Sequence, residues 1–548
     1  MSMRMTGLAL LLATMGLVAC GGGSDGPAAS SSGGGGGGVA GPSSLGADGW
    51  ANSQTDKVTG GDGADAAHTY TVTNRNELIQ ALYGGGATIN ADGSFSGTLD
   101  TTKKIIYIKG TINLSMNKAL VELVEADYVA ASVAAQPYDF AAYVAAYKPS
   151  VWNADPANWD TPNNRPKAVS GAQETARAAA SANQGKIVKI PVSANTSLLG
   201  LGADAKIIRG QLSLGDGADN VVIRNIAFED AFDYFPVWSP TDSFSLTTPA
   251  QAGCQAAYVD ATTGPQMCPG GRWNSNYDLI TLNGGKRIWI DHCSFSDGSR
   301  EDHTFASVFD APHVGVDYFI QHHDGAVDIT NKSDFVTLSY NHIKNHDKTH
   351  LIGSSDTVNV NNGWGALSVT LHHNYYENAG QRLPRVRMGK VHLYNNYYSG
   401  QIGYLGAYAP VDGTYVPPNR HLYGMGIGYL AKIYSENNVF DITSGNSTVV
   451  DDTVTFYTWH KASPSNPATD SAKLDYLQKT YFYDSGTLLN GAGTSLFVSA
   501  NAMAASMSKP VLEDTSTFWT PATNYTYTPD AANTVKAKVM ANAGAGKL

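Results

Sequence analysis

Three aspartates and an arginine precede similar eight-residue segments of the chain at similar offsets. Asp278 lies ten residues before one such segment, Asp324 and Asp328 lie twelve and eight residues before the next, and Arg382 lies nine residues before another. If these segments are equivalent positions in successive turns of a repeat, the four side chains share one external face. Carboxylates that lie close together repel one another unless a cation separates them. All-oxygen ligands at a surface site favour Ca²⁺ over Zn²⁺ or Cu²⁺.

The eight-residue segments alternate apolar and polar residues, which is the signature of a β-strand. The closest two begin 22 residues apart, as expected for one turn of a parallel β-solenoid. The sixth position of four segments is Asn, and the last position is aromatic or Ile. Stacked amides can satisfy one another's hydrogen bonds along such a solenoid. We therefore predict a right-handed, single-stranded parallel β-helix with an Asn ladder, built from the segments Val221–Phe228, Ile288–Phe295, Val336–Ile343, Val369–Tyr376, Val391–Tyr398 and Ile433–Phe440.

Composition supports a repeat-built extracellular protein. The 548 residues include 58 Gly, only 15% of the residues are charged, and the formal net charge is −11. A nucleic-acid partner is not expected, because non-specific binding of nucleic acid needs a basic face. Two Ala-rich stretches, Ala130–Ala146 and Thr175–Asn183, interrupt the repeat within residues 121–195. We expect them to form helices on the outside of the solenoid.

The N-terminus predicts export. Arg4 and the apolar run from Leu8 to Ala19 are typical of a secretory signal peptide over residues 1–19. The sequence then reads Leu-Val-Ala before Cys20, which resembles a bacterial lipoprotein signal and predicts a lipid anchor on Cys20; plain secretion is the alternative. Residues 20–45 are rich in Gly and Ser and predict a flexible linker. The β-helix domain is then residues 46–548.

The three remaining cysteines fit an oxidising compartment. Cys254 and Cys268 bracket a short loop and are candidates for a disulfide. Cys293 lies within a strand pattern and is interpreted as a small buried apolar residue. No cysteine pair has the spacing of a zinc site. Adjacent histidines such as His322 and His323 point to opposite faces of a strand, so we interpret them as packing or hydrogen-bonding residues.

The chain resembles polysaccharide lyase family 1, the pectate lyases. The resemblance extends from about Gly49 to Leu548 and therefore covers nearly the whole expected mature chain. It departs from the family at the N-terminus, between Cys254 and Cys268, and around residues 301–317. The motifs that carry it are Tyr277-Asp-Leu-Ile-Thr-Leu-Asn-Gly-Gly, Trp289-Ile-Asp-His, Gln321-His-His-Asp-Gly-Ala-Val-Asp, Asn345-His-Asp-Lys, Gly353-Ser-Ser-Asp and Gln381-Arg-Leu-Pro-Arg-Val-Arg.

The resemblance also implies which residues bind calcium, which residue acts as the catalytic base and which residues bind the substrate. It assigns calcium ligation to Asp278, Asp324 and Asp328, the catalytic base to Arg382, and binding of the substrate carboxylate to Lys348 and Arg387. On a regular strand Arg385 and Arg387 would share a face that excludes Arg382. Pro384 can break this alternation. We therefore follow the motif and keep both Arg382 and Arg387 as site residues.

The implied substrate is polygalacturonate or pectin of low methylation, cleaved by β-elimination to products with a 4,5-unsaturated end. Arginine has an ordinary pKa of about 12.5 or higher. We expect nearby Ca²⁺, Lys348 and Arg387 to lower the pKa of Arg382 by repulsion of like charges, so that alkaline pH favours the reaction. Hydrolysis would need a pair of carboxyl groups acting as acid and base or nucleophile, which the Arg and Lys cluster argues against. A non-catalytic β-helix that binds acidic polysaccharide is the alternative function. We expect the protein to be a monomer that contacts the membrane through Cys20.

Overall fold

The structure, a computed structural model, describes residues 47–55, 57–132, 135–160, 165–242, 271–309, 313, 319–402, 421–445, 449–461 and 479–548. All of these lie within one compact unit, Ala40–Leu548. Cys20, the signal and linker segments, Cys254 and Cys268 lie outside the described residues, so the structure does not test those predictions. Among the described helices, none is long and apolar enough to cross a membrane.

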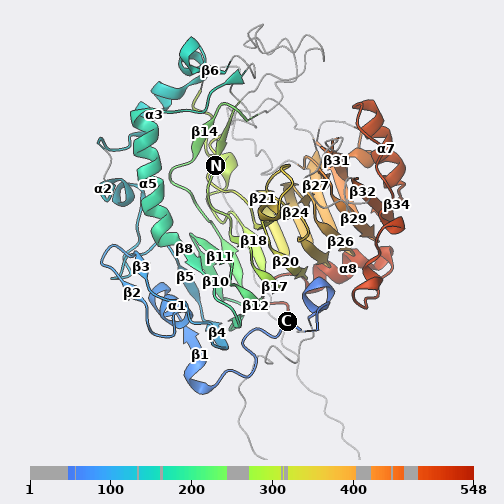
Figure 1. Ribbon diagram of the computed structural model, residues 1–548, viewed down its shortest axis with the longest axis horizontal. Coiled ribbons are helices and arrows are strands. Elements are labelled where there is room, and N and C mark those ends of the chain that lie inside the picture. The colour runs from blue at the N-terminus through green and yellow to red at the C-terminus, as the bar shows by residue number, and fades with distance from the viewer. Residues whose placement is uncertain are drawn as a thin grey trace, which may run out of the picture. The chain divides into compact units, whose positions relative to one another are not determined.

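Three parallel sheets form the body of this unit (Figure 1). The first sheet has ten described strands: β1 (Thr69–Val72), β4 (Lys104–Ile108), β9 (Thr196–Gly200), β12 (Asp219–Arg224), β17 (Lys286–Asp291), β20 (Asp334–Ser339), β23 (Ser368–His372), β26 (Lys390–Tyr394), β29 (Lys432–Glu436) and β32 (Tyr481–Ser485). The second contains β5 (Thr111–Asn113), β10 (Lys206–Ile208), β13 (Ala227–Glu229), β18 (Ser294–Ser296), β21 (His342–Lys348), β24 (Tyr375–Gln381), β27 (Tyr397–Ile402), β30 (Val439–Ser444), β33 (Leu488–Leu489) and β34 (Ala492–Gly493).

The third sheet contains β8 (Lys189–Pro191), β11 (Gln211–Gly215), β16 (Ile280–Asn283), β19 (Val327–Thr330), β22 (Leu351–Ile352), β25 (Arg385–Val386), β28 (Met425–Ile427) and β31 (Phe456–Thr458). Each coil adds one strand to the third sheet, one to the first and one to the second, as β16, β17 and β18 do. Apolar side chains of all three sheets fill the space between them. The predicted parallel β-helix is confirmed.

The predicted Asn ladder runs through the core. The side-chain amide of Asn341 donates to the amide oxygen of Asn374, Asn374 to Asn396, and Asn396 to Asn438, each over 3.0 Å. The backbone N–H of Cys293 donates to Asn341 at the start of the row. Cys293 is a buried free thiol, as predicted. The ladder satisfies buried polar groups coil by coil and thereby fixes the register between strands.

Aromatic rings stack beside the ladder in the second sheet. The ring centroids of Tyr376 and Tyr398 are 4.7 Å apart, and those of Tyr398 and Phe440 are 4.1 Å apart. Phe228 and Phe295 stack in the same way in earlier coils, at 5.4 Å. The stacked rings belong to the residues at the last position of the eight-residue segments.

Helices cover the outside of the coils. They are α1 (Arg75–Leu82), α2 (Glu125–Ala130), α3 (Phe140–Tyr147), α4 (Pro149–Trp152), α5 (Ala172–Val188), α7 (Leu496–Ser506) and α8 (Ala532–Asn542). The predicted helix over 130–146 is wrong in its extent, because α2 ends at Ala130 and α3 begins only at Phe140, where Asp139 caps its N-terminus. The second predicted helix lies within α5. Short antiparallel pairs also occur: β2 (Thr88–Ile89) with β3 (Phe95–Ser96), β6 (Trp159–Asp160) with β7 (Arg165–Pro166), and β14 (Val237–Ser239) with β15 (Arg272–Asn274).

Helix α5 supports the segment that leads into the third sheet. The hydroxyl of Tyr277 donates to the carbonyl oxygen of Ser181 over 3.2 Å, and Gln184 donates to the carbonyl oxygen of Phe232 over 2.7 Å. Tyr277 immediately precedes Asp278. The insertion therefore contributes to the position of one of the predicted site residues.

The terminal segments of the described unit meet on the outer face of the first sheet. The backbone N–H of Trp50 donates to Thr370, whose hydroxyl also lies 2.8 Å from that of Tyr525. The rings of Trp50 and Trp519 stack with centroids 5.7 Å apart. This contact covers strands β20 and β23 of the first sheet. The predicted site lies on a different face, that of the third sheet.

Candidate active site

Asp278 and Asp328 converge above Gly325. Asp278 lies just before β16, and Asp328 lies in β19, where its register partner is Thr281. The hydroxyl of Thr281 and the backbone N–H of Gly325 both donate to Asp278. A Cβ atom on Gly325 would lie 2.5 Å from Oδ1 of Asp328 and 2.6 Å from Oδ1 of Asp278. Gly325 is therefore required by the close approach of two carboxylates.

Both carboxyl groups have raised pKa values. Burial raises the pKa of Asp278 to about 6, with a further contribution from the negative charge of Asp324. Burial also raises the pKa of Asp328 well above its usual range, and the charge of Asp278 adds to the effect. A bound cation would relieve both repulsion and burial of charge. Oxygen ligands alone suit a hard cation such as Ca²⁺, so the residues fit the ion that the sequence predicted.

Asp324, the third predicted ligand, is bound to Lys348. The Nζ atom of Lys348 lies 2.8 Å from Oδ1 of Asp324, and the lysine side chain is only 1% exposed. Burial acts to raise the pKa of Asp324, but the charges of Lys348 and Arg382 outweigh it and lower the pKa. Burial lowers the pKa of Lys348, and the positive charge of Arg272 contributes. A predicted calcium ligand and a predicted substrate-binding residue thus neutralise each other.

Arg382 lies between β24 and β25 in the left-handed region, with φ of 61°. The strand alternation that seemed to separate Arg382 from Arg387 therefore does not apply, because β24 ends at Gln381. The Nε atom of Arg382 is buried and has no hydrogen-bond partner. Burial acts to lower its pKa, but the carboxylates of Asp324 and Asp328 raise it above the ordinary value. Carboxylates therefore dominate the surroundings of the guanidinium in this structure, and the expected lowering of the pKa, which depends on a bound Ca²⁺, stays a prediction.

Arg387 is held by the Gly353-Ser-Ser-Asp motif. Its Nε atom lies 2.8 Å from Oδ1 of Asp356, and its guanidinium also donates to the carbonyl oxygen of Gly353 over 3.0 Å. A Cβ atom at Gly353, whose φ is +86°, would lie 2.5 Å from the Arg387 carbonyl oxygen. The side chain of Arg387 is 15% exposed. It follows β25, two strands beyond the β19 strand of Asp328. Among the described hydrogen bonds and ion pairs, its side chain makes no direct contact with Asp328 or Lys348.

A polar network adjoining the site was missed by the sequence analysis. Arg272 of β15 donates to Gln321 over 2.6 Å and to Asp347 over 3.3 Å. Gln381 donates to the same carboxylate of Asp347 over 3.1 Å. Asp347 precedes Lys348 and Gln381 precedes Arg382, so the network links the neighbours of two site residues. Gln321, Asp347 and Gln381 stand within the recognised motifs, whereas Arg272 lies outside them and gave no signal.

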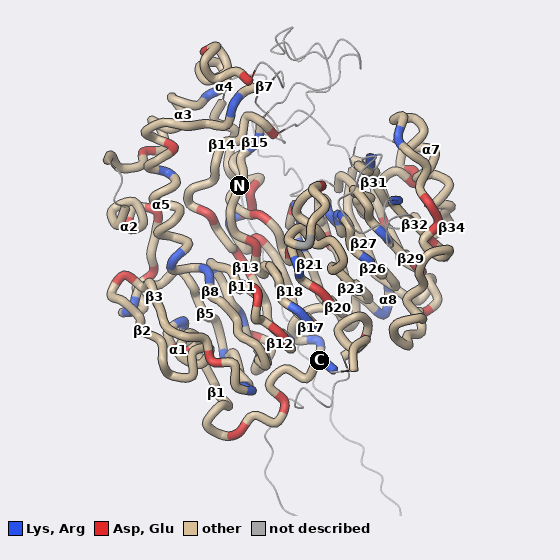
Figure 2. The backbone as a smooth tube through the Cα atoms, viewed as in Figure 1, with Lys and Arg blue, Asp and Glu red and all other residues tan. Residues whose placement is uncertain are grey.

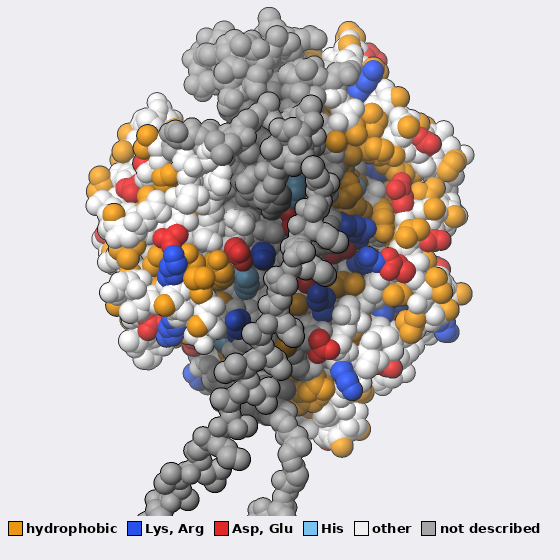
Figure 3. Space-filling model, turned by 180° about the vertical axis from the view of Figure 1, so that it is seen from behind, with side chains coloured by type: hydrophobic (Ala, Val, Ile, Leu, Met, Phe, Trp, Pro, Cys, Tyr) orange, Lys and Arg blue, Asp and Glu red, His pale blue; other side chains and the backbone are white. Residues whose placement is uncertain are grey.

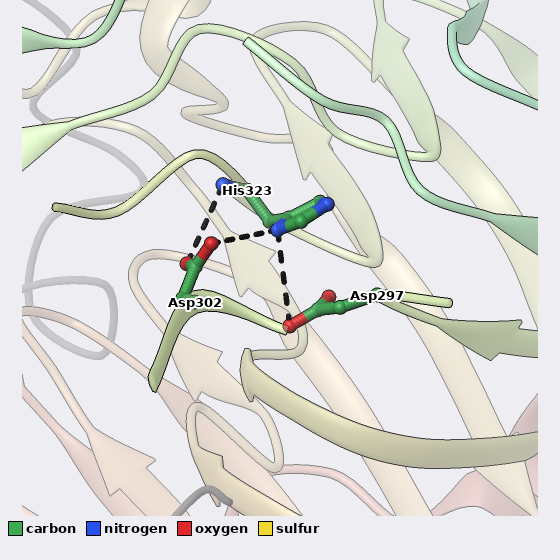
Figure 4. A group of neighbouring side chains, drawn as sticks. All are labelled: Asp297, Asp302 and His323. Carbon is green, nitrogen blue, oxygen red and sulfur yellow. Dashed lines mark hydrogen bonds and ion pairs between the residues drawn. The ribbon is translucent and has the colours of Figure 1, made fainter. Parts of the chain in front are cut away.

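A buried cluster of Asp297, Asp302 and His323 adjoins Asp324 in the sequence through His323 (Figure 4). In the described part of the chain it is the one group of three such side chains whose ligand atoms all lie within 4.8 Å of one another, so its composition could hold a metal ion. His323 Nδ1 lies 2.7 Å from Asp302, however, and its Nε2 lies 3.2 Å from Asp230. Burial acts to lower the pKa of His323, but these carboxylates raise it well above its usual range. The imidazolium of His323 therefore supplies the positive charge that a metal ion would otherwise provide to these carboxylates.

The site is thus a local balance of charges. Figure 2 shows acidic and basic residues close together on the middle strands of the stack, and Figure 3 shows blue and red side chains interspersed on the reverse face. No broad area of one sign appears on the described surface in that view.

The chain is similar to known proteins along most of its length. A family model described as pectate lyase matches residues 257–548. A pectate lyase of Bacillus subtilis (strain 168) is 38% identical over 511 residues, which cover 93% of this chain and 94% of the relative. The solved structure of a pectate lyase from Acidovorax avenae subsp citrulli is 39% identical with a TM-score of 0.75, over 92% of this chain and 95% of that chain. A pectate lyase bound to hexasaccharide is 36% identical with a TM-score of 0.66, over 91% and 97% of the two chains.

Proposed function

This chain belongs to the pectate lyase family, and from that premise we propose that it cleaves polygalacturonate by calcium-dependent β-elimination. The observation that carries the proposal is the convergence of Asp278 and Asp328 above Gly325, with Lys348 and Arg382 beside them. Carboxylates on one side and cations on the other suit a reaction on a uronate, whose own carboxylate needs both a bridging cation and direct ion pairs.

Asp278, Asp324 and Asp328 are the residues that would hold Ca²⁺. Ca²⁺ held there would supply positive charge beside the substrate carboxylates, which would make the C5 proton more acidic by stabilising the negative charge that develops next to it. Thr281, Gly325 and the backbone N–H of Leu351 orient Asp278 and Asp328 through hydrogen bonds before any ligand arrives. Such preorganisation reduces the cost of ordering the site on binding.

Arg382 is the proposed base. In its neutral guanidine form the side chain accepts the proton from C5 of the uronate and becomes a guanidinium, while the bond from C4 to the glycosidic oxygen breaks, which leaves a 4,5 double bond on one product. The base must be neutral to accept a proton, and Asp324 and Asp328 oppose this as long as their charges are uncompensated. If a cation neutralised Asp324 and Asp328, burial would remain as the main influence on the pKa of Arg382 and would favour its neutral form. An alkaline optimum follows.

Lys348 and Arg387 are proposed to bind uronate carboxylates. Lys348 is buried against Asp324, so its ammonium is already positioned and desolvated when the substrate arrives. Arg387 keeps an exposed part of its guanidinium while Asp356 fixes its orientation. The set of three aspartates favours demethylated substrate, because a methyl ester offers no charged partner to a bridging cation.

Export and attachment to the membrane are part of the proposal. Residues 1–19 act as a signal peptide, Cys20 carries the lipid, and residues 20–45 tether the β-helix domain of residues 46–548. The domain then acts as a monomer on polymer outside the cell.

Formation of unsaturated product tests the function directly. Polygalacturonate is incubated with the purified full chain, and the ultraviolet absorbance of the unsaturated uronide is followed with added Ca²⁺ and with excess chelator. We expect absorbance to rise with Ca²⁺ and to stay flat with chelator. Reducing ends that appear without this absorbance would identify a hydrolase, and binding without either signal would identify a non-catalytic binder.

A further inference from the structure

Asp347 is the centre of the polar network that adjoins the site. Its Oδ2 atom accepts hydrogen bonds from Arg272 over 3.3 Å, from Gln321 over 3.1 Å and from Gln381 over 3.1 Å. Its Oδ1 atom accepts a second bond from Gln381 over 3.1 Å. A Cβ atom on Gly380 would lie 2.5 Å from this Oδ1 atom, so the carboxylate packs directly on the backbone of β24. Three segments that are far apart in the sequence therefore hold one carboxylate.

Arg272 reaches this network from a firmly packed support. It belongs to β15, which pairs with β14 outside the coils. The next residue, Trp273, is 1% exposed, and its ring centroid lies 5.5 Å from that of Phe309 and 5.6 Å from that of Trp238. The Arg272 side chain is 11% exposed. Burial lowers the pKa of Arg272, and the negative charge of Asp347 is the largest influence in the opposite direction. The β14–β15 pair thus brings a fixed cation to Asp347.

Gln381 connects the network to Arg382. Gln381 is the last residue of β24, and its carbonyl oxygen accepts a hydrogen bond from the backbone of Thr349 over 3.1 Å. Arg382 follows with φ of 61°, a conformation that is unfavourable for residues other than glycine and persists only where surrounding contacts hold it. The carbonyl oxygen of Arg382 accepts from the backbone of His350 over 2.9 Å. The bonds from the Gln381 side chain to Asp347 add an anchor directly before the strained residue.

We propose that Arg272 is a positioning residue for the reaction: it holds Asp347, and through Asp347 and Gln381 it fixes the backbone that directs Arg382. This rests on the proposed function, since Arg382 is the base of that reaction. A guanidinium suits the role because its Nε and terminal nitrogens donate to two acceptors at once, here Gln321 and Asp347. A misplacement of about 1 Å can cost ~10²-fold in rate. Loss of Arg272 therefore acts on kcat rather than on KM.

Steady-state kinetics and hydrogen exchange test this role in the full chain. The variants are Arg272→Gln, Asp347→Asn and the double variant, assayed on polygalacturonate with saturating Ca²⁺. We expect Arg272→Gln to lower kcat about tenfold and to change KM by less than about twofold, because Lys348 and Arg387 still bind the substrate. The double variant should be no slower than the slower single variant, since both changes break the same connection. Backbone amides of residues 379–385 should exchange about tenfold faster in Arg272→Gln than in the wild type.

Arg224→Gln is the matched control, because Arg224 is a similarly buried arginine on the first sheet, 7% exposed and 3.0 Å from Asp291. It should leave kcat and the exchange of residues 379–385 unchanged, even where its thermal midpoint falls as far as that of Arg272→Gln. Wild-type kcat in folded Arg272→Gln, a rise in KM alone, or losses of kcat that add fully in the double variant would overturn the role.

Hydrogen exchange is measured without substrate, so it judges the role of Arg272 independently of the activity. Unchanged exchange of residues 379–385 in Arg272→Gln would overturn that role. Absence of lyase activity in the wild type would instead overturn the proposed function.

Discussion

Lys348 and Asp324 form an ion pair of 2.8 Å between a fully buried ammonium and a carboxylate at the mouth of the site. Each residue is proposed to bind a different partner, the lysine a uronate and the aspartate a calcium ion. In this structure each serves as the other's counter-charge. When cation and substrate bind together, the ion pair between Lys348 and Asp324 is replaced by two, one between the lysine and the uronate and one between the aspartate and the cation. Neither charged side chain is then left buried without a partner.

Gly325→Ala should weaken calcium binding and activity together. The added methyl group would meet Oδ1 of both Asp278 and Asp328 closer than atoms can approach. We expect the Ca²⁺ concentration for half-maximal activity to rise at least tenfold, which a calcium titration of the lyase rate measures. Gly493→Ala is the control, because a Cβ atom at Gly493 meets nothing within 4 Å. An unchanged calcium requirement in Gly325→Ala would remove this pair of carboxylates from the calcium site.

Arg382→Lys should lower kcat by the ~10²–10⁴-fold typical of a positioned proton-transfer group. KM should change little, since Lys348 and Arg387 still bind the carboxylates. Initial rates across a range of polygalacturonate concentrations measure both constants. Arg287→Lys, which alters an arginine paired with Asp219 on the first sheet, should behave as wild type. Near wild-type turnover in a folded Arg382→Lys protein would exclude this residue as the base.

Asp278→Asn should stabilise the protein in chelator. A carboxyl group whose pKa is raised by folding costs no stability below its unfolded pKa, near 3.8, and costs progressively more as the pH rises through its folded pKa, about 6. The amide removes that cost, so we expect the thermal midpoint at pH 7 to rise by about 3 °C.

The same variant should lose the stabilisation that Ca²⁺ gives to the wild type. Calorimetry at pH 4, 6 and 7, with and without Ca²⁺, measures both effects. Asp204→Asn, an exposed substitution, controls for the loss of one negative charge. A lower midpoint for Asp278→Asn in chelator would show that the carboxylate is stabilising as it stands, contrary to its raised pKa.

Cys20→Ser should release the protein from the membrane fraction and leave kcat unchanged. Lipid attachment needs the thiol, whereas the catalytic residues all belong to the β-helix domain. Fractionation of expressing cells followed by lyase assays measures both properties. Partition of the variant with membranes would contradict the lipid anchor.

The repeat could be predicted from the sequence because its cause is local. The alternation of Val369–Tyr376 and its equivalents sets which side chains face the core. A step of 22 residues, one turn of the solenoid, brings Asn374 next to Asn396 in the ladder. The offsets of Asp278, Asp324, Asp328 and Arg382 placed them on one face for the same reason. The motif then supplied their roles by resemblance.

Tertiary structure alone decided how these groups perturb one another. The carboxylates of Asp324 and Asp328, two strands away in the third sheet, raise the pKa of Arg382, and Asp324 forms an ion pair with Lys348. Arg272 enters the site from a strand outside the coils, and Trp459 lies 74 positions beyond Arg385 in the sequence yet contacts it. Periodicity fixes a residue's place on a coil, but charge and stacking depend on which side chains other coils and insertions bring within reach.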